Sequence, residues 1–160
     1  MPKKNSYNAI GLDEELSKKL IVELNEILAS YHIYYQNLRG FHWNIKGKHF
    51  FELHLKFEEL YNDALLKIDA LAERILTLGG VPFHTFEDYI KNAAFKEVKG
   101  IENDRDSVEI VAAHIGTLVL LERNAIKAAQ ELGDEGTTSL LTDDLTEKEK
   151  LIWMLNAWLN

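Results

Sequence analysis

The chain has 160 residues and no change in composition along its length, which favours one compact domain with a substantial core. Cysteine is absent, which excludes disulfides, thiolate metal sites and cysteine nucleophiles, so any metal must be held by nitrogen and oxygen. Acidic residues outnumber basic ones by 26 to 18, a formal net charge of −8, which argues against a nucleic-acid partner and suits a protein that attracts cations.

Residues 1–11 are predicted to form a short N-terminal tail, and residues 12–160 a single helical domain. The start, Met1-Pro2-Lys3-Lys4-Asn5-Ser6, lacks the apolar segment of a secretory signal. No stretch approaches the roughly 20 apolar residues that a membrane helix needs. We therefore expect a cytoplasmic protein without a membrane partner.

The first predicted helix spans roughly residues 12–39. Its apolar positions recur at spacings of three and four, the stripe of an amphipathic helix. They are Leu16, Leu20, Leu24, Ile27, Tyr31, Tyr34 and Leu38. Three acidic residues, 13–15, favour its positive N-terminal end.

A second helix of about 30 residues is predicted from Phe50 to Leu78, where Gly79-Gly80 and Pro82 end it. A third begins near Asn103 or Asp104 and ends at Gly133, since glycine readily takes the left-handed conformation that stops a helix. The fourth is predicted from about Thr142 to Trp158, with Asp143 and Asp144 in its first turn.

Some two dozen residues separate the second and third helices, too many for a tight turn, and their aromatic residues suggest a short extra helix packed outside. Four long helices with a long crossover between the second and third predict an all-α, ferritin-like four-helix bundle. An up-down-up-down bundle would need only short connections.

Two residue pairs on the second helix have the spacing of metal chelators. His54 with Glu58, and Asp69 with Glu73, lie four residues apart, which puts both side chains of each pair on one helix face. The simpler alternative is solvated surface charge, but both pairs flank apolar positions. Imidazole and carboxylate ligands suit iron, zinc or manganese, and spacing alone leaves these three metals open.

Helix geometry separates the two pairs within one chain. His54 and Asp69 are 15 residues apart, which is about 22 Å along a helix axis, too far to bind one ion. The same 15 residues return the azimuth to within about 60°, so both groups face nearly the same way. An antiparallel copy of the helix would bring His54 of one chain beside Asp69 of the other.

From Asn37 to Pro82 the sequence resembles the ferroxidase segment of the Dps family of miniferritins. The pieces that carry the resemblance are Phe41-His42-Trp43-Asn44, Gly47 with Phe50, Leu53-His54, Phe57-Glu58-Glu59-Leu60-Tyr61, Asp69 with Ala72-Glu73-Arg74, and Leu78-Gly79-Gly80. The helix pattern and the last helix with Trp153 extend the resemblance over nearly the whole chain.

The resemblance implies that His42 and His54 are iron ligands given by one subunit, and Asp69 and Glu73 those given by its two-fold neighbour. Many family members have aspartate where this chain has Glu58, an auxiliary acidic group for a second iron position. Trp43 resembles the tryptophan thought to donate electrons during oxidation. The alternative for Trp43 is packing alone.

The implied function is oxidation of Fe(II) by hydrogen peroxide at a site shared between two subunits. Ferric mineral would be stored inside a hollow homo-oligomeric shell of twelve subunits, which protects the cell from oxidative stress. Entry pores in related proteins are acidic, and Asp134, Glu135, Asp143 and Asp144 cluster before the last helix. Helix capping and a solvated turn are the alternatives for these four.

The remaining histidines match no ligand of the family pattern. His114 lies in an apolar run and is expected to be a satisfied buried or interface residue, whereas His32, His49 and His84 receive no assignment.

Three other functions are alternatives to iron oxidation and storage. Nucleoid binding would need lysine-rich tails, whereas only Lys3 and Lys4 precede the domain, so DNA binding is not expected. A non-catalytic helical scaffold would show no iron-dependent absorbance with Fe(II) and peroxide. A conventional ferritin would carry a Glu-x-x-His pair within one bundle, and the sequence contains none.

Overall fold

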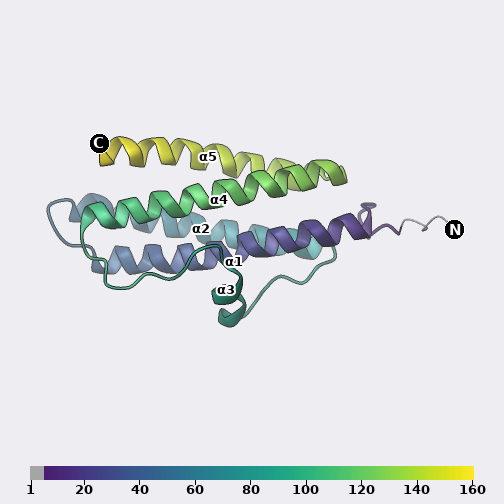
Figure 1. Cartoon of the computed structure of the whole chain (residues 1–160), viewed down its shortest axis with the longest axis horizontal. Helices are drawn as coiled ribbons and strands as arrows, with labels where there is room; N and C mark the ends of the chain where they lie inside the picture. Colours follow the sequence, from purple (N-terminus) through teal and green to yellow (C-terminus); the bar gives the residue numbers. More distant parts are fainter. Residues whose placement is uncertain (1–5) are drawn as a thin grey trace.

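Four long helices lie side by side along the long axis of the molecule, with a short helix outside them (Figure 1). The computed structural model describes residues 6–160, which form no strand. Its helices are α1 (Glu14–Asn44), α2 (Phe50–Thr77), α3 (Phe86–Asn92), α4 (Asp104–Leu132) and α5 (Glu135–Leu159). The predicted all-α bundle with a helix in the long crossover is confirmed. No helix among the described residues is both long and apolar enough to cross a bilayer.

The chain returns from the end of α2 to the opposite end of the bundle before α4 begins (Figure 1). As a result α4 runs parallel to α2, which a short turn could not achieve. Two buried asparagines of α1, Asn25 and Asn37, fasten this crossover. The Asn25 amide donates to the carbonyl of Val81 and accepts from the backbone N–H of Phe83. The Asn37 amide likewise donates to the carbonyl of Lys96 and accepts from the backbone N–H of Val98, and all four bonds measure 2.8–3.1 Å. These amides thereby satisfy four backbone groups of the crossover that lie outside α3.

Two histidines hold the same crossover by ring stacking. His32 of α1 stacks on Tyr89 at 3.7 Å between ring centroids, and His114 of α4 stacks on Phe95 at 4.0 Å. Burial lowers the pKa of each imidazole to about 4, so both are neutral at pH 7. His114 is buried as expected, but its Nδ1 has no hydrogen-bond partner among the described residues, so the expectation of a satisfied histidine was wrong.

The predicted ends of two helices differ from the structure. α1 continues five residues beyond the predicted end at residue 39, because Gly40 does not interrupt it and Phe41 packs on Phe57 with ring centroids 5.8 Å apart. Helix α5 begins at Glu135, seven residues before the predicted start at Thr142. The Asp134 side chain caps this start by accepting from the backbone N–H of Thr137 at 2.9 Å.

Charged side chains from α2, α4 and α5 meet a tyrosine hydroxyl of α1 inside the bundle. Lys148 of α5 lies 2.9 Å from Glu122 of α4 and 2.5 Å from Asp144 of α5. Asp144 also lies 2.5 Å from Lys67 of α2 and accepts a hydrogen bond of 2.6 Å from the Tyr31 hydroxyl of α1. Burial opposes ionisation of Asp144, but the two ammonium groups outweigh it and hold the pKa of that carboxyl below its ordinary value.

This network corrects the prediction of an acidic pore. Asp144 is paired inside the bundle and lies within α5 rather than in its first turn. Asp134 is buried and forms an ion pair with Arg74 of α2. Both carboxylates are therefore engaged within the chain. Only Glu135 and Asp143 of the four predicted residues are exposed, and a pore role for them stays a prediction.

We predict that Glu122→Gln weakens the pH dependence of stability. Glu122 is fully buried, and burial, opposed by Lys148, raises its pKa from 4.5 to about 8. Between those values the folded chain holds a proton that the unfolded chain has released, so the free energy of unfolding falls as pH rises, by at most about 1.4 kcal/mol per pH unit. Glutamine carries no titrating proton and removes this fall.

Chemical denaturation across that pH window, at fixed protein concentration, measures the effect. Glu131→Gln, at an exposed position of the same helix, is the matched control and should keep the slope of the unmodified protein. Parallel curves for Glu122→Gln and the unmodified protein would contradict the prediction.

Candidate metal centre

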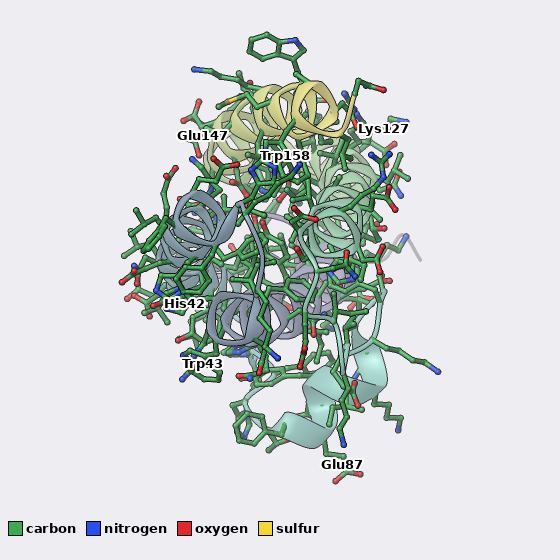
Figure 2. All side chains as sticks on the ribbon, turned by 90° about the vertical axis from the view of Figure 1, so that its left-hand side faces the viewer. His42, Trp43, Glu87, Lys127, Glu147 and Trp158 are labelled. Carbon is green, nitrogen blue, oxygen red and sulfur yellow. The ribbon has the colours of Figure 1, made fainter. Side chains whose placement is uncertain are left out.

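Three side chains from α1 and α2 converge on one point at the side of the bundle. His42 comes from the last turn of α1, while His54 and Glu58 lie one turn apart on α2. One ligand atom of each lies within 4.8 Å of the others, the spacing of a metal-binding group. Figure 2 shows His42 on the α1 and α2 side of the bundle, away from Lys127 of α4 and Glu87 of α3.

The two imidazoles are fixed by a reciprocal pair of hydrogen bonds. Nδ1 of His42 donates to the carbonyl oxygen of His54, and Nδ1 of His54 donates to the carbonyl oxygen of His42, both at 2.7 Å. A carbonyl oxygen can only accept, so both protons must lie on Nδ1. The Nε2 lone pair of each ring is then free for a metal ion, the usual arrangement of ligating histidines. The rings stack with centroids 3.7 Å apart.

The local sequence explains why these bonds form. The His42 carbonyl lies in the last turn of α1, where carbonyls lack an intrahelical partner. The N–H that would continue the helix, that of Lys46, donates instead to the carbonyl of Glu102 at 2.8 Å. Gly47, with φ of 112°, turns the chain in a conformation that favours glycine, and α2 then returns alongside α1. His54 thus meets His42 across the two helices.

Two aromatic side chains wall the centre. Phe50 stacks on His54 with centroids 5.0 Å apart, and Tyr61 meets His42 edge to face at 5.4 Å. Neither residue was predicted at the site from the sequence. The available signal was helical spacing, since Phe50 lies four residues before His54 and Tyr61 three residues after Glu58.

Asp69 and Glu73, the other two predicted ligands, do not join this group within the chain. Both are exposed on α2, and their carboxylates make no hydrogen bond or ion pair with residues 6–160. Fifteen residues of helix, about 22 Å, separate Asp69 from His54, as the sequence geometry requires. One chain therefore supplies two imidazoles and one carboxylate at one point and two unpaired carboxylates at another.

Trp43 is not part of the ligand group. Its indole is 58% exposed, and the Arg39 guanidinium lies 4.7 Å from its ring centroid. Figure 2 shows Trp43 on the same side of the bundle as His42. His49 lies outside the cluster, and its Nδ1 is 2.7 Å from a carboxylate oxygen of Glu52.

The long crossover, the four-helix bundle and a centre of histidine and carboxylate ligands define the ferritin-like class of proteins. In agreement, the family model for the ferritin-like domain matches residues 21–160. The Dps protein of Vibrio cholerae O1 is 49% identical and superimposes with a TM-score of 0.95, covering 99% of both chains. Its structure is described as a member of a broad superfamily of ferritin-like diiron-carboxylate proteins.

Two curated relatives support the same family. A DNA protection during starvation protein from Porphyromonas gingivalis is 40% identical over 97% of this chain and 98% of its own. General stress protein 20U of Bacillus subtilis is 39% identical over 90% of this chain and 99% of its own. The chain belongs to the Dps family of miniferritins, whose members serve in iron storage and protection under stress.

We predict that His54→Ala lowers the affinity of the protein for Co(II), used as a spectroscopic probe, by at least about tenfold. Removing a residue that only orients a metal ligand already causes a loss of that size. The change deletes one Nε2 ligand and leaves the His42 carbonyl without its donor. Titration followed by visible absorption measures the affinity. His49→Ala, outside the cluster, should bind Co(II) as the unmodified protein does. Equal affinity for His54→Ala would remove His54 from the site.

Proposed function

We propose that the protein is a ferroxidase that oxidises Fe(II) with hydrogen peroxide at a centre completed by two copies of the chain. His42, His54 and Glu58 would come from one copy, and Asp69 and Glu73 from its neighbour. Ferric mineral would be stored within a hollow shell of twelve copies in the cytoplasm. The observation that carries the proposal is the division of ligands within one chain: three converge, and two unpaired carboxylates lie about 22 Å away on the same helix.

A second apolar face on α2 supports the pairing of copies. The buried residues of α2 form one stripe toward the core. At 100° per residue, five large apolar side chains fall on the opposite side of the helix, which also carries Asp69 and Glu73. They are Phe51, Leu55, Leu65, Leu66 and Leu76, between 50% and 81% exposed. Exposed large apolar side chains gathered on one helix face are typical of a protein interface.

The positions of the ligands along α2 determine where the two-fold axis of such a pair would lie. His54 would meet Asp69 of an antiparallel copy if a two-fold axis passed between Tyr61 and Asn62, midway along the sequence between the two ligands. The same axis would place Phe50 opposite Glu73, so both acidic residues would approach the imidazoles together. An isologous contact makes two such centres, one at each end.

The ligand chemistry suits iron oxidation. Carboxylates favour Fe(III) over Fe(II), and two imidazoles with a few carboxylates leave positions open for peroxide. Two Fe(II) ions supply one electron each, and peroxide with two protons leaves as two water molecules, so no hydroxyl radical forms. The hydrogen bonds on Nδ1 keep both rings in place as the charge on the metal rises. Zinc and manganese take the same ligand types and would compete.

The two-chain centre can be tested by complementation. One variant carries His42→Ala and His54→Ala, the other Asp69→Asn and Glu73→Gln, and each alone should be inactive. In a mixed pair one centre combines both defects, while the other receives intact histidines and intact acids. Peroxide-driven iron oxidation, followed by ferric absorbance, should partly return after co-assembly. Mixed shells without recovered activity would rule out the two-chain centre.

The names of relatives raise direct DNA binding as a second function. We propose instead that protection comes from consuming iron and peroxide, because a chain with a net charge of −8 repels the phosphate backbone when many copies assemble. Lys3 and Lys4, the basic residues of the N-terminal tail, lie outside the described residues.

Removal of residues 1–6 should therefore leave DNA affinity unchanged, with no measurable binding near physiological salt. Gel-shift assays of the full chain and the shortened chain, at low and at physiological salt, compare the two. Tight binding by the full chain that is lost on shortening would show that two lysines repeated over many subunits suffice.

A further inference from the structure

An ammonium group lies against oxygen atoms from three helices inside the bundle. Nζ of Lys148 is 2.9 Å from an oxygen of Glu122 on α4 and 2.5 Å from an oxygen of Asp144 on α5. The Tyr31 hydroxyl of α1 is 3.3 Å and 2.6 Å from the same two oxygens. Two carboxyl groups and one phenol thus surround a single positive charge.

These oxygens have the chemistry of a metal site. Oxygen donors without nitrogen or sulfur suit hard divalent cations such as Mn(II), which bind them at about 2.0–2.6 Å. The ammonium nitrogen is held at distances only slightly longer than these. In addition, Oε2 of Glu122 is buried and has no hydrogen-bond partner among residues 6–160, whereas the large majority of buried polar side-chain atoms are paired. The carboxyl of Glu122 therefore has an oxygen to spare for a further ligand bond.

We propose that Glu122, Asp144 and Tyr31 form a second cation site of the protein, and that the ammonium group of Lys148 is its resident cation. By occupying this site, Lys148 excludes divalent metal ions from the bundle interior and leaves them to the centre between α1 and α2. Lys148 is thus a residue that determines where the protein binds metal.

The balance of charge allows a metal ion to take the place of the ammonium group. Burial raises the pKa of Glu122 to about 8, so at pH 7 this carboxyl is neutral beside the cationic Lys148 and the anionic Asp144. The three groups then carry no net charge. One divalent cation in place of the ammonium group, with release of the Glu122 proton, leaves the same local charge. The exchange therefore buries no additional net charge in the interior.

An open pocket of about 430 Å³ leads from the surface to this site. Buried Tyr31 and Lys148 both line it. Its other charged side chains are three carboxylates and three lysines, which balance one another. They are Glu59, Asp63, Glu147, Lys56, Lys67 and Lys150. Because these charges cancel, the pocket does not repel cations, and the exclusion of metal ions depends on Lys148.

The test is Lys148→Met, which keeps a long flexible side chain and removes its charge. It is made together with His42→Ala and His54→Ala, which remove the imidazole ligands of the centre between α1 and α2. Binding of Mn(II) to the assembled protein is followed by loss of the electron paramagnetic resonance signal of the free ion. One more Mn(II) per chain should bind than to the same protein with Lys148. Calorimetry near pH 7, in buffers of different ionisation enthalpy, should show that this binding releases the Glu122 proton.

Two further variants in the same background isolate the site. Lys150→Met, at an exposed position of the same helix that also lines the pocket, should bind no additional Mn(II). Adding Glu122→Gln to Lys148→Met should abolish the additional ion, since the amide is not an anionic ligand.

A Lys148→Met chain that does not fold in metal-free buffer remains informative. The variant then leaves the buried carboxyl groups without their cation, and Mn(II) is expected to restore its helical circular dichroism. Lys148→Gln, whose amide can donate hydrogen bonds to the same oxygens, is the second variant. Failure of Mn(II) to bind to or restore either chain would overturn the proposal.

Two other results would also overturn it. One is an additional ion that survives Glu122→Gln, because that ion binds elsewhere. The other is a Mn(II) ion that the unmodified protein binds and that Glu122→Gln alone loses, because Lys148 would then fail to exclude metal. None of these measurements uses iron or peroxide, so their results are independent of whether the protein is a ferroxidase.

Discussion

The paired hydrogen bonds between His42 and His54 are the constraint on which the candidate centre depends. Each imidazole donates to the backbone of the other helix, so these two side chains join the end of α1 to the second turn of α2. This fixes the register of the two helices, and with it the positions of Glu58 and Tyr61. The backbone supplies both acceptors, so neither bond can be lost by substitution of an acceptor side chain.

Two pairs of carboxylates in this chain have opposite surroundings. Asp144 lies inside the bundle, where Lys67 and Lys148 neutralise it, and the buried Glu122 beside Lys148 keeps its proton because burial raises its pKa to about 8. Asp69 and Glu73 are exposed and unpaired within residues 6–160. A buried carboxylate without a counter-ion is costly, so lysine in effect occupies the place that a cation would take in the bundle interior.

Much of this arrangement could be predicted from the sequence, because it depends on local spacing. Apolar periodicity predicted the four long helices, and the four-residue spacing predicted that His54 and Glu58 share a face. The contact between His42 and His54 depends on how two helices pack, which spacing alone cannot reveal, and only the family resemblance suggested His42. The start of α5 was missed because it depends on Arg74, which pairs with the capping Asp134 from 60 residues away. Asp144 was misread because a paired buried charge and a capping charge look alike in sequence.

The outward apolar face of α2 has a consequence for the chain before it assembles. A newly made subunit exposes Phe51, Leu55 and Leu66 to water, which favours pairing at once and penalises long-lived monomers. On the proposed arrangement, a lone subunit also lacks the acids that would complete its centre. The rate of iron oxidation would then rise more steeply than in proportion to the concentration of the chain when few subunits are present. Iron oxidation would begin only once subunits have paired.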